Sequence, residues 1–112
     1  VDDDADITDL FRRFLKPSLD VYVATGAEQA EEVLRSRKVT HLVVDSFLGS
    51  NIPSGSALVA RWRAEHGSVV FAAVFTGDVR LAEGEHPGVD QVFLKPGGFE
   101  SLVSLLREAA AA

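Results

Sequence analysis

The sequence predicts an α/β domain built on a parallel β-sheet that is covered by helices on both faces. Three short apolar runs have the length and the Val- and Phe-rich composition of buried strands: His41–Asp45, Val69–Phe75 and Val89–Leu94. Segments with the apolar spacing of amphipathic helices separate these runs along the chain. Strands that alternate with helices in one small domain are typical of a parallel sheet with both faces covered.

The first part of the chain is predicted to form two helices and a short strand. Apolar residues recur at the i, i+3, i+4, i+7 spacing of a helix that Pro17 ends: Ile7, Leu10, Phe11 and Phe14. Asp20–Ala24 is predicted to be a short strand. Gly26 then leads into a second helix whose inner side carries four apolar residues: Ala27, Ala30, Val33 and Leu34.

The second part of the chain contains a polar loop, two further helices and one weak segment. Phe47–Gly55 is a loop by composition, and a helix that opens at Ala57 is expected to end by His66-Gly67. The final helix repeats the helical spacing and runs to the end of the chain, with an inner side of Phe99, Leu102, Val103 and Leu106. Between Thr76 and Val89 few apolar residues are available, so the fourth helix is expected to be short or irregular.

Length and composition limit the classes of protein. A chain of 112 residues is enough for one domain and too few for two, so residues 1–112 are expected to be a single domain. Because there is no Met, this domain is expected to lack its first few residues, and it is compatible with being part of a longer protein.

Charge and residue usage exclude several kinds of site. The net charge of −6 argues against binding of nucleic acid by a basic surface. The absence of Cys excludes disulfides and thiolate metal sites. No apolar run approaches the roughly 20 residues of a membrane helix. We therefore expect a cytoplasmic domain that binds neither membrane nor nucleic acid directly.

Polar side chains stand where the predicted strands end. Asp2 and Asp3 follow the stub of a first strand, and Asp45, Thr76 and Lys95 follow three later strands. The carboxyl ends of parallel strands meet at one edge, so these side chains are expected to converge there. Three neighbouring carboxylates require a cation, and Mg²⁺ prefers such oxygen ligands. A carboxylate nucleophile, Mg²⁺, a hydroxyl and an ammonium group together suit phosphoryl transfer to an aspartate.

Four groups of residues, in order along nearly the whole chain, resemble the receiver domain of two-component response regulators. Each group alone is common, whereas the complete set is specific. The resemblance implies a flavodoxin-like fold, which is a doubly wound five-stranded parallel sheet in the order 2-1-3-4-5 with helices on both faces. The groups are Val1-Asp2-Asp3-Asp4, Leu42-Val43-Val44-Asp45, Thr76-Gly77 after a strand ending at Phe75, and Phe93-Leu94-Lys95-Pro96.

The resemblance also assigns a role to each residue of the site. Asp45 would be the phosphoacceptor, and Thr76 and Lys95 would bind oxygens of the phosphoryl group. Gly77 would leave room for that group. The Lys95–Pro96 peptide bond would be cis, because proline lowers the free-energy cost of the cis form. The implied Mg²⁺ ligands are Asp2, Asp3, Asp45 and the backbone carbonyl of Phe47.

Three features depart from the family pattern. The loop Gly49–Gly55 contains a short insertion beside the site. Val92 stands where the family has an aromatic residue that follows the threonine inward when the domain is phosphorylated. The segment 77–88 is either tolerated loop variation or an altered docking face.

Two functions remain open at this stage. In the first, a histidine kinase or phosphotransfer protein phosphorylates Asp45, and the charge alters the surface that contacts an output domain or a downstream protein. The alternative is a pseudo-receiver, an interaction module that keeps the fold without switching; Val92 favours it. A phosphatase is disfavoured, because Phe47 stands where such enzymes place a second acid. We expect a signalling domain with at most slow self-dephosphorylation and not an enzyme, and it is compatible with a homodimer.

Overall fold

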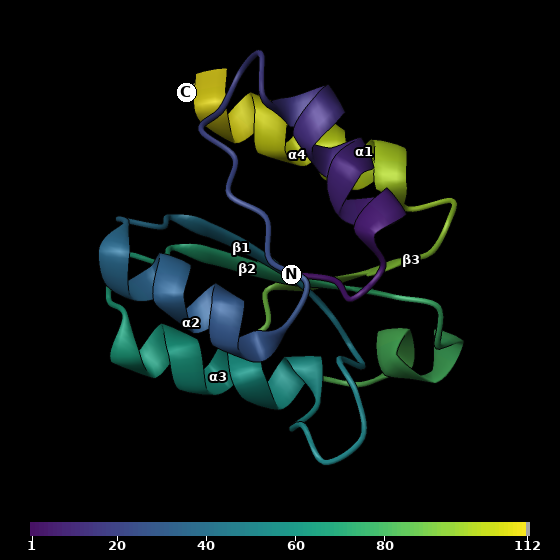
Figure 1. The fold of residues 1–112 in the computed structure, drawn as a ribbon. Coiled ribbons are helices and arrows are strands. Elements are labelled where there is room, and N and C mark those ends of the chain that lie inside the picture. The colour runs from purple at the N-terminus through teal and green to yellow at the C-terminus, as the bar shows by residue number, and fades with distance from the viewer. Residues whose placement is uncertain (112) are drawn as a thin grey trace.

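The computed structural model describes residues 1–111 and contains a parallel sheet between two pairs of helices. Figure 1 shows α2 and α3 side by side on one face of the sheet and α1 and α4 on the other. In chain order the elements are α1 (Ala5–Leu15), α2 (Ala27–Ser36), β1 (His41–Asp45), α3 (Gly55–Glu65), β2 (Phe71–Thr76), the 3₁₀ helix η1 (Val79–Glu83), β3 (Gln91–Leu94) and α4 (Phe99–Ala111).

The sheet has three strands in the order β1-β2-β3, all parallel. His41 of β1 pairs with Phe71 of β2, and this register brings Asp45 beside Phe75. Thr76 in turn pairs with Leu94 of β3. Both connections between these strands run through helical segments, as a parallel sheet requires.

The predicted parallel sheet with helices on both faces is confirmed. Of its five predicted strands, three form in residues 1–111, and the first two do not. At the place of the predicted first strand, the Val1 carbonyl accepts from the Asp45 N–H at 2.8 Å, and the Asp2 N–H donates to Ala24 at 3.0 Å. These bonds place the start of the chain between the segment 20–24 and β1, as the order 2-1-3 predicts. A strand requires a repeated ladder, and one such bond to Ala24 does not make the segment 20–24 a strand.

A cavity lies where the ladder is missing. Its volume is about 390 Å³, and it separates part of the segment 20–24 from β1 and α1. Val21, Val23 and Val43 line it together with Phe11 and other apolar side chains. The segment 20–24 is therefore held near the sheet by its ends and by side-chain packing more than by backbone pairing.

Each face of the sheet carries its own apolar core, because successive residues of a strand point to opposite faces. Ala72 and Val74 of β2 pack toward α2 and α3, where Trp62 is fully buried. Ala73 and Phe75 pack toward α1 and α4. Phe11 of α1 makes edge contacts with Phe75 and with Phe99 of α4, at ring-centroid distances of 5.6 and 5.0 Å. Phe11 and Phe99 thus pack α1 and α4 against each other and against Phe75 of β2.

Local signals account for the helix boundaries. Asp4 caps α1 by accepting the N–H of Asp6 at 2.9 Å, and Ser54 caps α3 by accepting the N–H of Ala57 at 3.3 Å. The short fourth helix expected between β2 and β3 is η1, which buries none of its residues. Among residues 1–111, no helix combines the length and the apolar character needed to cross a membrane.

Candidate functional site

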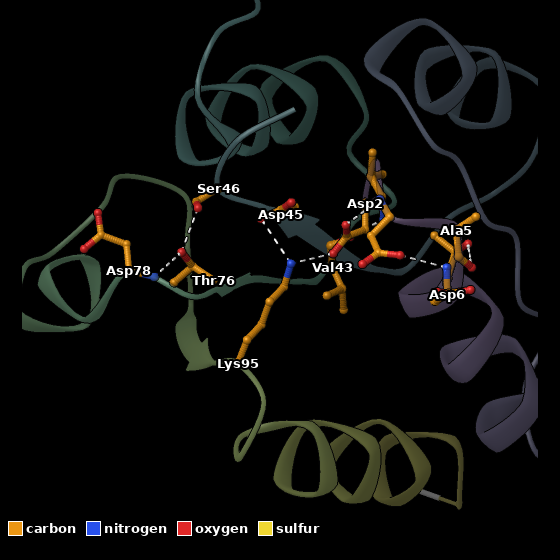
Figure 2. Close-up of polar contacts among 12 residues, drawn as sticks. Asp2, Ala5, Asp6, Val43, Asp45, Ser46, Thr76, Asp78 and Lys95 are labelled. Atoms are coloured by element: carbon orange, nitrogen blue, oxygen red, sulfur yellow. Dashed lines mark hydrogen bonds and ion pairs between the residues drawn. The ribbon is translucent and has the colours of Figure 1, made fainter. Parts of the chain in front are cut away.

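The polar side chains predicted to converge do meet at the carboxyl edge of the sheet. Asp45 is the last residue of β1, Thr76 is the last residue of β2, and Lys95 follows β3. Asp2 reaches the same edge because the start of the chain is hydrogen-bonded beside β1. Figure 2 shows the Lys95 side chain rising between these strand ends toward Asp45 and Asp2.

Three carboxylates form a compact acidic cluster. One oxygen from each of Asp2, Asp3 and Asp45 lies within 4.8 Å of the other two. Asp2 and Asp45 are buried, with 5% and 9% of their surface exposed, whereas Asp3 is exposed. A cluster of hard oxygen atoms at this spacing fits a small divalent cation such as Mg²⁺. Buried carboxylates without such a partner are costly, so this donor set favours binding of a cation.

Lys95 supplies a positive charge within this acidic cluster. Its Nζ donates a hydrogen bond to Asp2 Oδ2 at 2.8 Å and lies 3.5 Å from Asp45 Oδ1. The ammonium group also lies 5.6 Å from the centroid of the Phe75 ring, which is favourable for a cation. The Lys95–Pro96 peptide bond is cis, as the resemblance implied. Lys95, near the end of the chain, thus joins two buried acids, Asp2 at the start of the chain and Asp45 at the end of β1.

The charges at this edge shift the pKa values of its groups. Burial raises the pKa of Asp45, and the nearby charge of Asp2 adds to that effect. Lys95 and the backbone N–H of Phe47 act in the opposite direction. Burial by itself would lower the pKa of Lys95, but its hydrogen bond to Asp2 and the charges of Asp2 and Asp45 outweigh burial and raise it. Lys95 therefore stays charged at neutral pH, while the ionised form of Asp45 is disfavoured.

The start of the chain lies at the same edge. The Val1 nitrogen donates to the Val43 carbonyl at 2.6 Å. Among residues 1–111, Lys95 is the side-chain cation that contacts the carboxylates of Asp2 and Asp45.

Thr76 occupies the neighbouring strand end and is almost fully buried, with 1% of its surface exposed. Its Oγ1 accepts the backbone N–H of Asp78 at 3.0 Å. The same oxygen lies 2.7 Å from the hydroxyl of Ser46, which is the residue after Asp45. Figure 2 shows this pair of hydroxyls on one side of Asp45 and the contacts with Lys95 on the other.

Sequence reasoning missed two residues of this site. Ser46 was not singled out, although its position directly after Asp45 places it at the same edge. Gly55 was interpreted only as the end of a loop, yet its N–H donates to the Ser46 carbonyl at 2.9 Å. A Cβ atom at Gly55 would lie 2.0 Å from the carbonyl oxygen of Asp45. The first residue of α3 therefore packs directly against the backbone of Asp45 and Ser46, and only glycine fits there.

Three further residues named from the sequence are Phe47, Gly77 and Val92. The structure gives none of them a contact that bears on the role predicted for it. Phe47 exposes 61% of its surface, and its backbone N–H lowers the pKa of Asp45, against the larger effect of burial. Gly77 has open space where a Cβ would stand. Val92 is half-buried in β3 and packs against the core beneath α2 and α3. The metal-binding role of the Phe47 carbonyl stays a prediction.

Comparison with known proteins places this fold. No protein-family model matches the chain, and neither does any curated protein sequence. Among solved structures, the signal receiver domain of an HD domain-containing protein from Pseudomonas fluorescens Pf-5 is similar, with a TM-score of 0.79 and 26% identity. That alignment covers 96% of this chain and 88% of the other.

Two longer proteins contain a similar domain. A response regulator from Burkholderia pseudomallei, whose structure has a phosphorylated aspartic acid, a calcium ion and citrate, gives a TM-score of 0.76 at 24% identity. The alignment covers 98% of this chain and 65% of that one. NtrX from Brucella abortus, in complex with ADP, gives 0.80 at 21% identity, over 97% of this chain and 25% of NtrX. The fold of this chain is the flavodoxin-like fold of response regulator receiver domains.

Proposed function

We propose that residues 1–112 form a single receiver domain that accepts a phosphoryl group on Asp45 and changes a partner-binding surface in response. The observation that carries this proposal is the contact of Lys95 with both Asp2 and Asp45, at distances of 2.8 and 3.5 Å. It gathers an acceptor carboxylate, a second acid and a cation at one strand edge beside the Thr76 hydroxyl. The similar fold of response regulator receivers supports the same function.

We propose that Mg²⁺ binds to Asp2, Asp3, Asp45 and the backbone carbonyl of Phe47. The carboxylate oxygens within 4.8 Å of one another support this ligand set, and Asp2 and Asp45 expose only 5% and 9% of their surface. When bound, Mg²⁺ would neutralise negative charge on the oxygens of the phosphoryl group. The Burkholderia pseudomallei regulator, whose structure has a phosphorylated aspartic acid and a calcium ion, supports a divalent cation in this kind of domain.

The proposed reaction uses groups that already lie at one edge of the sheet. A carboxylate oxygen of Asp45 attacks the phosphorus atom of a phosphohistidine on a histidine kinase or phosphotransfer protein. A P–O bond forms and the P–N bond breaks, and the electron pair returns to the imidazole. Lys95, already 3.5 Å from Asp45, pairs with one phosphoryl oxygen, and the Thr76 hydroxyl donates to another. The domain is a signalling module with at most slow self-dephosphorylation.

A small phosphodonor with Mg²⁺ tests this function directly. Intact-mass spectrometry should show one added phosphoryl group on the wild-type protein and none when EDTA removes the metal. Asp45→Asn should carry no adduct, whereas Asp3→Asn should carry one that forms more slowly. If the wild-type protein stays unmodified, or if the Asp45→Asn variant still gains the group, the proposal is wrong.

The second candidate function is a pseudo-receiver that keeps the fold and has lost the switch. Val92 favours it, because a half-buried valine lacks the bulk of the aromatic residue that the resemblance implies at this position. Amide NMR spectra of the phosphorylated and unphosphorylated protein distinguish the two functions. Shifts that extend along residues 77–94 support a switch. Shifts that stop at the residues in contact with Asp45 support the pseudo-receiver.

The proposed partners follow from the same function. A histidine kinase or phosphotransfer protein would supply the phosphoryl group, and an output domain or a downstream protein would receive the signal. NtrX, of which this chain covers 25%, is a similar fold within a much longer protein. Identification of the kinase and the output partner requires pull-down with the phosphorylated protein.

A further inference from the structure

We propose that Ser46 is a positioning residue that holds the Thr76 hydroxyl away from Asp45 until a phosphoryl group arrives. The inference rests on the proposed function of Asp45 and Thr76 and adds a residue to it. It starts from the 2.7 Å contact between Ser46 Oγ and Thr76 Oγ1. This contact joins the residue after the acceptor to the last residue of the neighbouring strand.

The register of the sheet creates this contact. Asp45 pairs with Phe75, so the next residues along the two parallel strands, Ser46 and Thr76, come side by side. Gly55 fixes the Ser46 backbone, because its N–H donates to the Ser46 carbonyl and its missing Cβ allows close packing. The position of the Ser46 backbone is thus set by the sheet and by the start of α3, and it brings the Ser46 hydroxyl within hydrogen-bond distance of Thr76.

The count of donors and acceptors gives the direction of the hydrogen bond. Thr76 Oγ1 already accepts the N–H of Asp78 at 3.0 Å, and Thr76 has 1% of its surface exposed. Its single hydroxyl hydrogen needs an acceptor inside the protein, because solvent does not reach it. Ser46 is only partly buried and can direct its own hydrogen to water. Thr76 therefore donates to Ser46.

This bond has a consequence for phosphorylation. Thr76 has one hydrogen, so it cannot donate to Ser46 and to a phosphoryl oxygen with equal strength. Figure 2 shows the Thr76 hydroxyl facing Ser46 and Asp78, while the Asp45 carboxylate faces Lys95 and Asp2. Donation to the phosphoryl group requires that Thr76 leave Ser46. The Ser46–Thr76 bond therefore stabilises the unphosphorylated state relative to the phosphorylated one.

Removal of the Ser46 hydroxyl should consequently favour the phosphorylated form. In Ser46→Ala the Thr76 hydrogen loses its acceptor in the resting state, and the phosphoryl group restores one. With beryllium fluoride and Mg²⁺ as a phosphoryl mimic, we expect Ser46→Ala to bind about three- to ten-fold more tightly than the wild-type protein, the scale of one hydrogen bond. Ser46→Thr keeps the acceptor oxygen and should bind as the wild-type protein does.

A double-mutant cycle shows whether Ser46 acts through Thr76. Thr76→Val removes the hydroxyl at nearly constant volume, and in that background Ser46→Ala should leave the affinity for the mimic unchanged. General loosening of the fold would weaken binding in both backgrounds, which separates a structural role from a positioning one. Thermal unfolding of each variant without ligand verifies that all are folded.

The outcomes separate this inference from the function on which it rests. If the wild-type protein accepts a phosphoryl group and Ser46→Ala binds the mimic equally or more weakly, the role of Ser46 is wrong and the proposed function stands. An equal gain from Ser46→Ala with and without the Thr76 hydroxyl would likewise contradict it. If the wild-type protein accepts no phosphoryl group, both proposals fall together.

Discussion

Asp2, Asp45 and Lys95 are joined by charge, whereas Ser46 and Thr76, on the other side of Asp45, are joined by a bond between two neutral hydroxyls. The charged side links the start of the chain to the residue after β3, over distances of 2.8 and 3.5 Å. The hydroxyl side links two adjacent strand ends at 2.7 Å. Charges act over several ångströms and tolerate small shifts, while a hydroxyl pair depends on register and direction. The charged side is therefore suited to bind, and the hydroxyl side is suited to respond.

Both sides depend on the close approach of α3 to β1, so the largest effect should follow from disturbing that approach. In Gly55→Ala, the new Cβ would meet the Asp45 carbonyl oxygen at 2.0 Å, and backbone atoms would have to move. We expect a loss of about 2–4 kcal/mol in the free energy of unfolding, measured by urea denaturation.

Gly67→Ala is the matched control, since nothing lies within 4 Å of a Cβ at that position. Its free energy of unfolding should stay within about 0.5 kcal/mol of the wild-type value. A Gly55→Ala protein as stable as this control would show that α3 does not constrain Asp45 and Ser46.

The charged side alone is broken by Lys95→Ala. Asp2 and Asp45 then face each other without a cation. In the wild-type protein the ion pair of Lys95 with Asp2 is mostly buried, with 23% of the lysine side chain and 6% of the aspartate side chain exposed. We expect a loss of about 1–3 kcal/mol without metal, between the values for exposed and buried pairs. Mg²⁺ should restore part of this stability and should bind more tightly than to the wild-type protein, because a competing positive charge has gone.

Lys38→Ala provides the comparison for that experiment, since Lys38 is exposed and precedes β1. It should change neither stability nor Mg²⁺ affinity measurably. Weaker Mg²⁺ binding to Lys95→Ala would mean that the lysine orders the carboxylates for the metal instead of competing with it.

The charged side was predictable from the sequence to a greater degree than the hydroxyl side. Charged residues at the ends of apolar runs are visible in the sequence, and parallel strands bring those ends together, so Asp45 and Lys95 were found in advance. The Ser46–Thr76 contact depends on register, which a sequence does not show, although both residues stand at strand ends. The close approach of Gly55 depends on where α3 docks.

The fold shows the same limit of sequence reasoning. The three strands of the observed sheet were predicted because their apolar runs are uninterrupted. The segment 20–24 has a strand composition but no strand geometry, since only Asp2 supplies it with a backbone bond in the described chain. Composition identifies a segment that could form a strand. Whether it does depends on a neighbouring segment whose N–H and C=O groups can form several backbone hydrogen bonds with it.

Asp45→Asn tests the electrostatic part of the comparison through pH. The pKa of Asp45 is raised in the folded protein, first by burial and then by Asp2. A raised carboxyl pKa means that the folded state holds its proton longer than the unfolded state does, so stability falls as pH rises from the unfolded value of 3.8 through the higher folded value. At pH 7 without metal, Asp45→Asn should be more stable, and each kcal/mol gained would raise Tm by roughly 4 °C.

This advantage should vanish below pH 3.8, where Asp45 is protonated in both states, and it should shrink when Mg²⁺ is added to the wild-type protein. Calorimetry from pH 3 to pH 8 gives both comparisons. Equal stability of the two proteins across that range would show that Lys95 fully compensates the burial of Asp45.

The smallest effect is expected from Val92→Ala, a change in β3 outside both the charged and the hydroxyl side. Val92 is half-buried and packs against the core beneath α2 and α3, so its truncation should cost about 1 kcal/mol of stability. It makes no charged contact, and the rate of adduct formation with a small phosphodonor should change less than about two-fold. If the rate falls more than ten-fold, the packing of Val92 controls the position of Thr76. The valine would then have the role that the resemblance gives to an aromatic residue. If the rate holds, Val92 contributes packing in β3 and takes no part in the acceptance of the phosphoryl group at Asp45.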